Sequence, residues 1–280
     1  MLGFLKKRRE AVSEALPASI GEQRRVYAIG DIHGRADLLV EILEAIFADN
    51  AARSPLHCQI IFLGDLVDRG HQSAQVVMCA MEMARRGAPV RFLKGNHEEV
   101  FVRAARGDVK MTRFFCRIGG RETILSYGLP EADYAAMDFT QLAAWMLENI
   151  PREHVDFVDG FEDMVDIGDY LFVHAGIRPD VPLDAQQPSD LRWIRDEFLS
   201  FREPLGRIVV HGHTITPAVD QRSNRIGIDT GAFQSGRLTA IGLEGTERWF
   251  LSTGDNVTAA PLDLTSDDML PDGDETDVDQ

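Results

Sequence analysis

The stretch VYAIGDIHG, Val26 to Gly34, holds the pattern that decides the fold. Val26 to Ile29 is a short β-rich run that predicts a buried strand. Asp31 and His33 follow directly, between two glycines, and a helical pattern then runs from about Ala36 to Ala48. The stretch therefore predicts a strand–loop–helix unit whose loop carries a carboxylate and an imidazole at the carboxyl end of the strand.

Two further units of the same kind follow. Gln59 to Leu63 predicts a second strand, which leads through the polar loop Gly64 to Gly70 into a helix ending near Arg86. Val90 to Leu93 predicts a third strand, followed by the loop Gly95-Asn-His-Glu98 and another helix. Three successive units of this type imply parallel strands whose polar loops collect along one edge of the sheet, where α/β proteins place their chemistry.

The rest of the chain first turns helical and then returns to strands. A helical insert is predicted over about 100–150, and it includes the runs Phe114 to Ile118 and Gln141 to Asn149 around a Gly119-Gly120 break. Strands are predicted at Met164 to Ile167, Tyr170 to Val173, Ile208 to Val210, Arg225 to Asp229 and Leu238 to Leu243. Their close spacing favours antiparallel neighbours. We expect an α/β fold in which two mixed β-sheets pack as a sandwich flanked by helices.

Composition sets the outer boundaries of this domain. Residues 1–23 are predicted to form a leader, helical in part, and 24–251 a single large domain. Residues 252–280 hold nine carboxylates and no Lys or Arg, so an acidic disordered tail is expected there. Subtracting those nine from the formal net charge of −16 leaves about −7 for the remainder.

Charge, cysteine content and hydropathy narrow the partners and the compartment. A domain and a tail that are both negatively charged repel a polyanion, so no nucleic-acid partner is expected. No stretch approaches the roughly 20 apolar residues that span a bilayer, and no secretory signal is recognised, so no membrane partner is expected. The three cysteines form no C-x-x-C pair, which favours a reducing, cytoplasmic setting. The oligomeric state is left open.

The polar residues at the predicted strand ends are of an unusual kind. Of eight histidines in the chain, five fall directly after predicted strands, and Asp or Asn stands beside several of them. A lone Gly-Asp after a strand is most often a turn, and a lone histidine is most often structural. Because several such residues stand at successive strand ends, turns and structural histidines alone do not explain the pattern.

Carboxylate, imidazole and amide oxygen together suit borderline divalent ions such as Mn, Fe, Zn or Co. The ligands are too many for one ion, which indicates two. Paired ions bridged by a carboxylate can clamp the attacking and leaving oxygens of a displacement at phosphorus, and a water that bridges both would become the nucleophile.

Five ordered motifs carry a specific resemblance. The chain resembles the calcineurin-like metallophosphoesterases, from about Val26 to Leu243, and within them the PPP-type serine/threonine protein phosphatases, in particular the bacterial and phage members. The motifs are Gly30-Asp-Ile-His-Gly34, Gly64-Asp-Leu-Val-Asp-Arg-Gly70, Gly95-Asn-His-Glu98, His174-Ala-Gly176 and Gly212-His-Thr214.

The resemblance implies roles for individual residues. Asp31 and His33 would hold one metal ion, Asp65 would bridge, and the second ion would be held by Asn96, His174 and His213. Two divalent ions bring +4 and two carboxylates return −2, so a residual of about +2 would match a phosphate dianion. Manganese is the expected activating ion, with Fe, Zn, Co or Ni as alternatives.

Further residues would act on the substrate. The resemblance implies that His97 is the general acid, oriented by Asp68, and that Arg69 grips phosphate oxygens with its guanidinium fork. Arg195 resembles a second phosphate-binding arginine, with a plain helix-surface residue as the alternative. His211 is expected to support His213 rather than to bind metal, and Glu98 to anchor its loop.

The substrate is less determined than the chemistry. The sequence Gly212-His-Thr-Ile215 lacks the second histidine of diesterase and nuclease branches, which favours the PPP branch. The favoured function is hydrolysis of phosphoserine or phosphothreonine in proteins. The alternative is hydrolysis of symmetrical dinucleoside tetraphosphates, and a second alternative is a phosphate-binding module without catalysis.

Overall fold

A computed structural model describes residues 17–254. The predicted leader over residues 1–16 and the predicted disordered tail from residue 255 onward lie outside the described residues. Residues 17–23, the rest of the predicted leader, lie within the described part. Ile20 is fully buried in the core between the two sheets, and its backbone N–H donates to the carbonyl oxygen of Gly245 at 2.8 Å.

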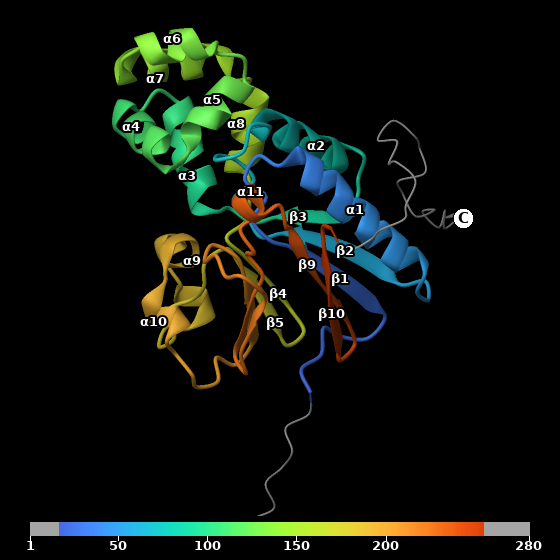
Figure 1. The fold of residues 1–280 in the computed structure, drawn as a ribbon. Coiled ribbons are helices and arrows are strands. Elements are labelled where there is room, and N and C mark those ends of the chain that lie inside the picture. Colours follow the sequence, from blue (N-terminus) through green and yellow to red (C-terminus); the bar gives the residue numbers. More distant parts are fainter. Residues whose placement is uncertain (1–16, 255–280) are drawn as a thin grey trace, which may run out of the picture.

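Two five-stranded mixed sheets form the centre of the protein, as the sequence predicts (Figure 1). The first sheet has the order β10-β9-β1-β2-β3, and the second has the order β4-β5-β6-β8-β7. The strands of the first are β1 (Arg24–Ile29), β2 (His57–Phe62), β3 (Val90–Phe92), β9 (Thr239–Glu244) and β10 (Glu247–Ser252). Those of the second are β4 (Met164–Ile167), β5 (Tyr170–Val173), β6 (Ile208–His211), β7 (Asp220–Gln221) and β8 (Arg225–Gly227).

The strand directions confirm one expectation and correct another. β1, β2 and β3 are parallel, as the three strand–loop–helix units predict. The antiparallel arrangement expected for the second half is wrong for its centre, because β5, β6 and β8 run parallel to one another. Long helical or irregular connections join these strands, and such crossovers permit parallel pairing. Only β4 and β7 add to this sheet in antiparallel fashion.

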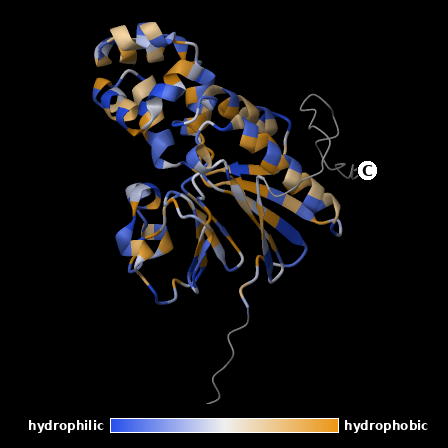
Figure 2. Cartoon of the chain, viewed as in Figure 1, coloured by the Kyte–Doolittle hydropathy of each residue, from blue (hydrophilic) through white to orange (hydrophobic). Residues whose placement is uncertain are grey.

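Alternation along β1 explains how one strand serves two cores. Tyr27 and Ile29 point into the core beneath the helices, whereas Val26 and Ala28 point into the core between the two sheets. A strand with period-2 side chains and two covered faces must be apolar on both, which is why Val26 to Ile29 is a continuous hydrophobic run. Figure 2 shows the complementary pattern on the helices, which are striped with hydrophobic and hydrophilic residues.

Helices cover the outer faces of the sheets (Figure 1). The first sheet is covered by α1 (Ala36–Ala51) and α2 (Ser73–Arg85). The predicted insert is a group of short helices and extends further than expected, to residue 159; it consists of α3 (Asn96–Ala105), α4 (Val109–Ile118), α5 (Gly120–Ser126), α6 (Glu131–Ala136), α7 (Phe139–Asn149) and α8 (Arg152–Asp159). The second sheet packs on η1 (Leu183–Ala185), α9 (Pro188–Trp193) and α10 (Asp196–Leu199), and α11 (Ala232–Ser235) lies near the strand ends. No helix among residues 17–254 is long and apolar enough to cross a membrane.

The backbones of the two sheets approach each other closely where β1 ends. A Cβ atom built on Gly30 would lie 2.7 Å from the carbonyl oxygen of Ile228, which follows β8 in the other sheet. Only glycine leaves room for this approach of one backbone to another. The loops that follow β1 and β8 are therefore held side by side.

Replacing Gly30 with alanine should disturb this junction. The added methyl group meets a backbone carbonyl that cannot rotate away, so we expect a loss of roughly 1–3 kcal/mol in the free energy of unfolding and a loss of the phosphoesterase activity expected from the sequence. Gly87→Ala is the matched control, because Gly87 has a φ of 73° but no atom within 4 Å, and it follows α2 at the opposite end of the sheet. Urea unfolding and phosphatase assays should show lost stability in both variants and lost activity only in Gly30→Ala.

Candidate metal centre

The strand ends place the predicted site residues together at the edge where the two sheets meet. The loops after β1 and β2 are joined by a hydrogen bond from the backbone N–H of His33 to the carbonyl oxygen of Asp65 at 2.8 Å. The loops after β5 and β6 are joined by a bond from the Gly212 N–H to the His174 carbonyl at 2.8 Å. The site is therefore built on the backbone of both sheets rather than on free loops.

Backbone strain concentrates in these loops. Within residues 17–254, six residues other than glycine have positive φ, and five of them are predicted site residues. The five are His33 (46°), Asp65 (50°), Asp68 (75°), Arg69 (68°) and His213 (64°). Such conformations cost free energy and persist only where the surrounding structure enforces them, which is typical of functional sites.

The first cluster consists of His33, Asp65 and His97, all buried. The Nε2 atoms of His33 and His97 lie 3.6 Å and 3.8 Å from Asp65 Oδ2. His33 donates from Nδ1 to the carbonyl oxygen of Val67 at 2.8 Å. Since a carbonyl can only accept, Nε2 of the neutral His33 ring carries a lone pair that faces the cluster.

The second cluster consists of Asp65, His174 and His213, again all buried. His174 donates from Nδ1 to the carbonyl oxygen of Leu63 at 2.9 Å, so its Nε2 also carries a lone pair. That atom lies 3.0 Å from Asn96 Oδ1, 3.2 Å from His213 Nδ1 and 3.4 Å from Asp65 Oδ1. Several acceptor atoms therefore face one another in a buried space that holds too few N–H or O–H donors to pair with them. Such a group of lone pairs is suited to binding a cation.

Asp65 belongs to both clusters and turns one oxygen to each. Oδ2 faces His33 and His97, whereas Oδ1 faces His174. Two buried His/Asp clusters that share a carboxylate are consistent with a dinuclear metal site. The mixed nitrogen and oxygen ligands suit several divalent ions and do not select one of them.

Asp31 lies beside the clusters rather than within either of them. Its carboxylate is 2% exposed and accepts the backbone N–H of His213 through both oxygens, at 3.0 Å and 3.2 Å. A metal-ligand role for Asp31 stays a prediction. The contact shows how tightly the loop after β1 is joined to the loop after β6.

His97 is held by a chain of hydrogen bonds that begins in the helical insert. His97 Nδ1 donates to Asp68 Oδ2 at 2.6 Å, and Asp68 Oδ1 accepts the hydroxyl of Thr123 at 2.7 Å. Burial lowers the pKa of His97, but the charges of Asp65 and Asp68 outweigh it, so the pKa is raised overall. The pairing of His97 with Asp68 matches the sequence prediction, whereas Thr123 carried no sequence signal because it lies 55 residues away from Asp68.

Arg69 lies over the first cluster. Its two terminal nitrogens are 2.7 Å from His33 Nε2 and 3.0 Å from His97 Nε2. Its guanidinium carbon also lies 4.9 Å from the ring centre of Phe233, which in turn contacts the His33 ring edge-on. Phe233, on α11, is a further residue that the sequence pattern did not single out.

Arg195 stands at the first position before α10, exposed to solvent. Its side chain has no hydrogen bond or ion pair with any residue in 17–254. Burial and the neighbouring His174 lower the pKa of His213 to about 2, and the positive charge of Arg195 acts in the same direction. Arg195 therefore lies close enough to the second cluster to act on it electrostatically.

Glu98 anchors its loop, as predicted. Its carboxylate accepts the backbone N–H groups of Asp65 and Leu66, each at 2.7 Å, and that of Gly95 at 2.9 Å. Burial raises the pKa of Glu98 to about 7. His211 lies outside both clusters and bonds through Nδ1 to the carbonyl oxygen of Gly212, not to His213.

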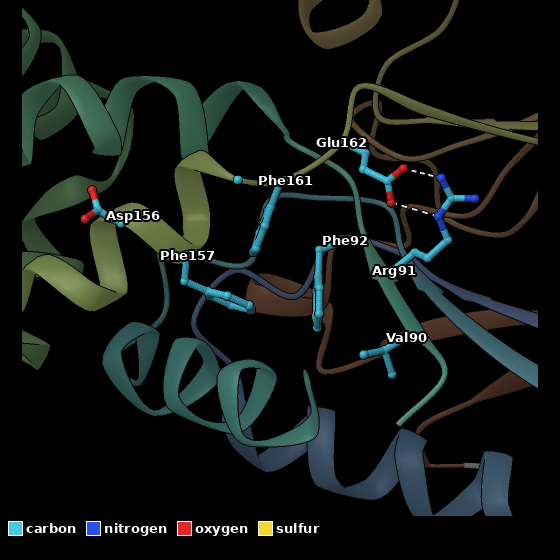
Figure 3. A pocket seen from close by; sticks show the side chains of 8 residues that line it. Val90, Arg91, Phe92, Asp156, Phe157, Phe161 and Glu162 are labelled. Atoms are coloured by element: carbon cyan, nitrogen blue, oxygen red, sulfur yellow. Dashed lines mark hydrogen bonds and ion pairs between the residues drawn. The ribbon is translucent and has the colours of Figure 1, made fainter. Parts of the chain in front are cut away.

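A separate pocket of about 340 Å³ lies between β3 and α8 (Figure 3). The rings of Phe92 and Phe161 are stacked there with centres 5.1 Å apart, and Phe157 meets both edge-on. Arg91 and Glu162 form an ion pair at its rim. Neither metal cluster contributes a residue to the pocket, and its aromatic lining offers no comparable chemistry.

Comparison with known proteins agrees with this geometry. The family model for calcineurin-like phosphoesterases matches residues 24–255. An asymmetrical bis(5'-nucleosyl)-tetraphosphatase, PrpE of Anoxybacillus flavithermus, is 26% identical over 238 residues, which cover 76% of this chain and 88% of that protein. A symmetrical bis(5'-nucleosyl)-tetraphosphatase of Actinobacillus succinogenes is 27% identical over 154 residues, 55% of this chain and 45% of that protein.

A solved structure supports the fold. A crystal structure described provisionally as a diadenosine tetraphosphatase superposes with a TM-score of 0.56 at 19% identity, covering 84% of this chain and 96% of that one. The chain belongs to the calcineurin-like phosphoesterase family and is a metal-dependent phosphoesterase. The narrower resemblance to PPP-type protein phosphatases is not confirmed by these comparisons.

Replacing Asp65 with asparagine should remove the charge shared by both clusters while keeping the side chain's size. We expect the variant to bind fewer than the ~2 Mn²⁺ ions per chain expected of the parent, and to hydrolyse p-nitrophenyl phosphate at least about 100-fold more slowly. Metal content after gel filtration and steady-state assays provide the measurements. Asp163→Asn, which removes a carboxylate paired with Arg192 at the surface, should change neither. Near-normal turnover in Asp65→Asn would contradict the bridging role.

Proposed function

We propose that this calcineurin-like phosphoesterase hydrolyses dinucleoside tetraphosphates at the metal centre built around Asp65. The observation that carries the proposal is the similarity to bis(5'-nucleosyl)-tetraphosphatases, which extends over 88% of the length of PrpE. The clusters agree with it, since both lie within residues 24–255, which the family model for calcineurin-like phosphoesterases matches. The dinucleotide alternative considered from the sequence thus replaces phosphoprotein hydrolysis as the favoured function, with asymmetrical cleavage proposed in place of the symmetrical hydrolase expected there.

The centre would take two divalent ions, one in each cluster. His33 and Asp65 would hold one together with Asp31, and Asn96, His174 and His213 would hold the other with Asp65. Bound there, the ions would supply Lewis acidity, neutralising phosphate charge and lowering the pKa of water. Orientation of the substrate and proton transfer to the leaving group would fall to side chains of the protein.

Two arginines would orient the phosphate chain. The Arg69 guanidinium already lies over the first cluster, and its planar fork suits two oxygens of one phosphate. Arg195 lies near the second cluster with no ion pair within residues 17–254, so its charge is available to an anionic substrate. A tetraphosphate bridge carries more negative charge than a single phosphate ester, which makes two separately placed cations useful.

His97 would deliver the proton to the leaving oxygen. Its Nδ1–H is bonded to Asp68, so a protonated ring presents its second N–H, on Nε2, to the cluster where the substrate would lie. Asp68 in turn keeps one ring orientation and favours the charged form of the imidazole. Thr123 fixes Asp68 from the helical insert.

The Thr123 hydroxyl offers a test of this proton-transfer role. In Thr123→Val, Asp68 loses a donor, so His97 should be less well oriented and kcat should fall about 10-fold with little change in KM. The fall should be larger for phenyl phosphate than for p-nitrophenyl phosphate, because the poorer leaving group depends more on protonation. Thr112→Val is the matched control, since Thr112 is an equally buried threonine in the same insert and donates only to Asp108. Equal falls on both substrates would contradict the assignment.

The substrate proposal is tested directly by comparing two phosphate compounds. After metal removal and addition of Mn²⁺, kcat/KM on diadenosine tetraphosphate should exceed that on a phosphothreonine peptide. The relatives matched over most of their length are asymmetrical enzymes, so chromatography should show ATP and AMP as the products. Two molecules of ADP would indicate symmetrical cleavage. A preference for the peptide would favour the second candidate function, hydrolysis of phosphoserine or phosphothreonine. That function is the one implied by the resemblance of the five ordered motifs to those of PPP-type phosphatases.

A further inference from the structure

Asp229 is a buried carboxylate that neither the sequence motifs nor the roles above account for. It follows β8, and its side chain is 1% exposed. The predicted strand Arg225 to Asp229 ends two residues early in the structure, so Asp229 lies in the loop after the strand rather than within it. That loop stands at the same edge of the sheets as the loops of the metal centre.

One half of the Asp229 carboxylate is satisfied and the other is not. Oδ1 accepts the backbone N–H of Gly231 at 2.9 Å. Oδ2 has no hydrogen-bond partner and is the only carboxylate oxygen in this condition among the buried side-chain atoms of residues 17–254. No lysine or arginine in this part of the chain forms an ion pair with Asp229. A buried anionic oxygen without a partner is strongly unfavourable, so its environment calls for a cation.

The neighbours of Asp229 are the members of the metal centre. Burial raises the pKa of Asp31, and the charges of Asp229 and Asp65 raise it further. Asp229 also interacts electrostatically with Asp65, which both clusters share, and with His174, which belongs to the second cluster. The close approach of Gly30 to Ile228 explains the pairing, because these residues directly precede Asp31 and Asp229.

The side chain best placed to share a proton with Asp229 is Asp31, another carboxyl group, which brings no positive charge of its own. Asp31 is satisfied by the backbone N–H of His213, but that single donor does not reach Asp229. Arg69 is engaged with the rings of His33 and His97. The free oxygen of Asp229 is therefore best matched by positive charge that enters the centre from outside the chain.

We propose that Asp229 is a third carboxylate of the metal centre and contributes its free Oδ2 to binding of the ion on the Asp31 side. With Asp31 and Asp65 it returns −3 against the +4 of two divalent ions, which leaves +1 instead of +2. The proposal concerns metal binding alone and holds for any phosphoester substrate. Its failure would leave the proposed dinucleotide hydrolysis untouched.

The test is Asp229→Asn, measured without substrate. Asparagine keeps the volume and can keep the bond from the Gly231 N–H, but it removes the charge. In the metal-free protein the variant should be at least as stable as the parent, because an unpaired buried charge is gone. Calorimetric titration of the metal-free protein with Mn²⁺ should show one site weakened about 10- to 100-fold, the size of effect seen when groups around a metal are removed. The thermal stabilisation by Mn²⁺ should shrink accordingly.

Two controls separate this outcome from a structural role. Asp229→Glu keeps the charge and should retain a larger share of the Mn²⁺ affinity than Asp229→Asn. Asp220→Asn removes a carboxylate paired with Arg225 on the adjoining β7–β8 ladder, and should lower stability slightly without changing metal affinity. Unchanged affinity of Asp229→Asn for both ions would overturn the proposal. So would a metal-free Asp229→Asn that is less stable than the parent, since the charge would then have a favourable partner within the chain.

Discussion

The charge of one buried carboxylate, Asp65, organises the centre of this protein. Both oxygens of Asp65 face imidazole nitrogens of residues that follow different strands, His33 and His97 on one side and His174 on the other, and the backbone N–H of His97 donates to Oδ1. A buried charge is tolerated only where several groups compensate it. The loops after the central strands of both sheets must therefore close around this point, and the glycines and positive φ angles in those loops follow from that requirement.

The histidine tautomers are set by main-chain carbonyls rather than by other side chains. His33 and His174 each give their Nδ1 proton to a carbonyl oxygen, of Val67 and Leu63 respectively. Backbone in a strand or a constrained loop moves little, so the lone pairs on Nε2 are aimed before any ion arrives. This rigid aim is what distinguishes the centre from an accidental group of polar residues.

The helical insert is tied to the centre at two points. Thr123 bonds Asp68, and the carbonyl oxygen of Gly119 accepts the backbone N–H of Arg69 at 3.0 Å. Gly119 has a φ of 118°, and a side chain there would collide with Arg69. The insert thus fixes the residues that we assign to proton transfer and phosphate binding, while both sheets fix the metal ligands. This division permits substrate preference to vary on an unchanged metal centre.

The sequence by itself determined the parts that local pattern encodes. The apolar runs before Asp31, Asp65 and Asn96 mark strands, and polar residues directly after parallel strands must share one edge, so the metal centre and the two mixed sheets were predictable. Tertiary structure alone decided what joins residues far apart in the chain. It set the parallel order of β5, β6 and β8, the support of Asp68 by Thr123 and the position of Asp229 against Asp31. These contacts depend on how the two sheets and the helical insert pack against one another. The periodicity of a short stretch of sequence does not indicate which distant residue it will contact.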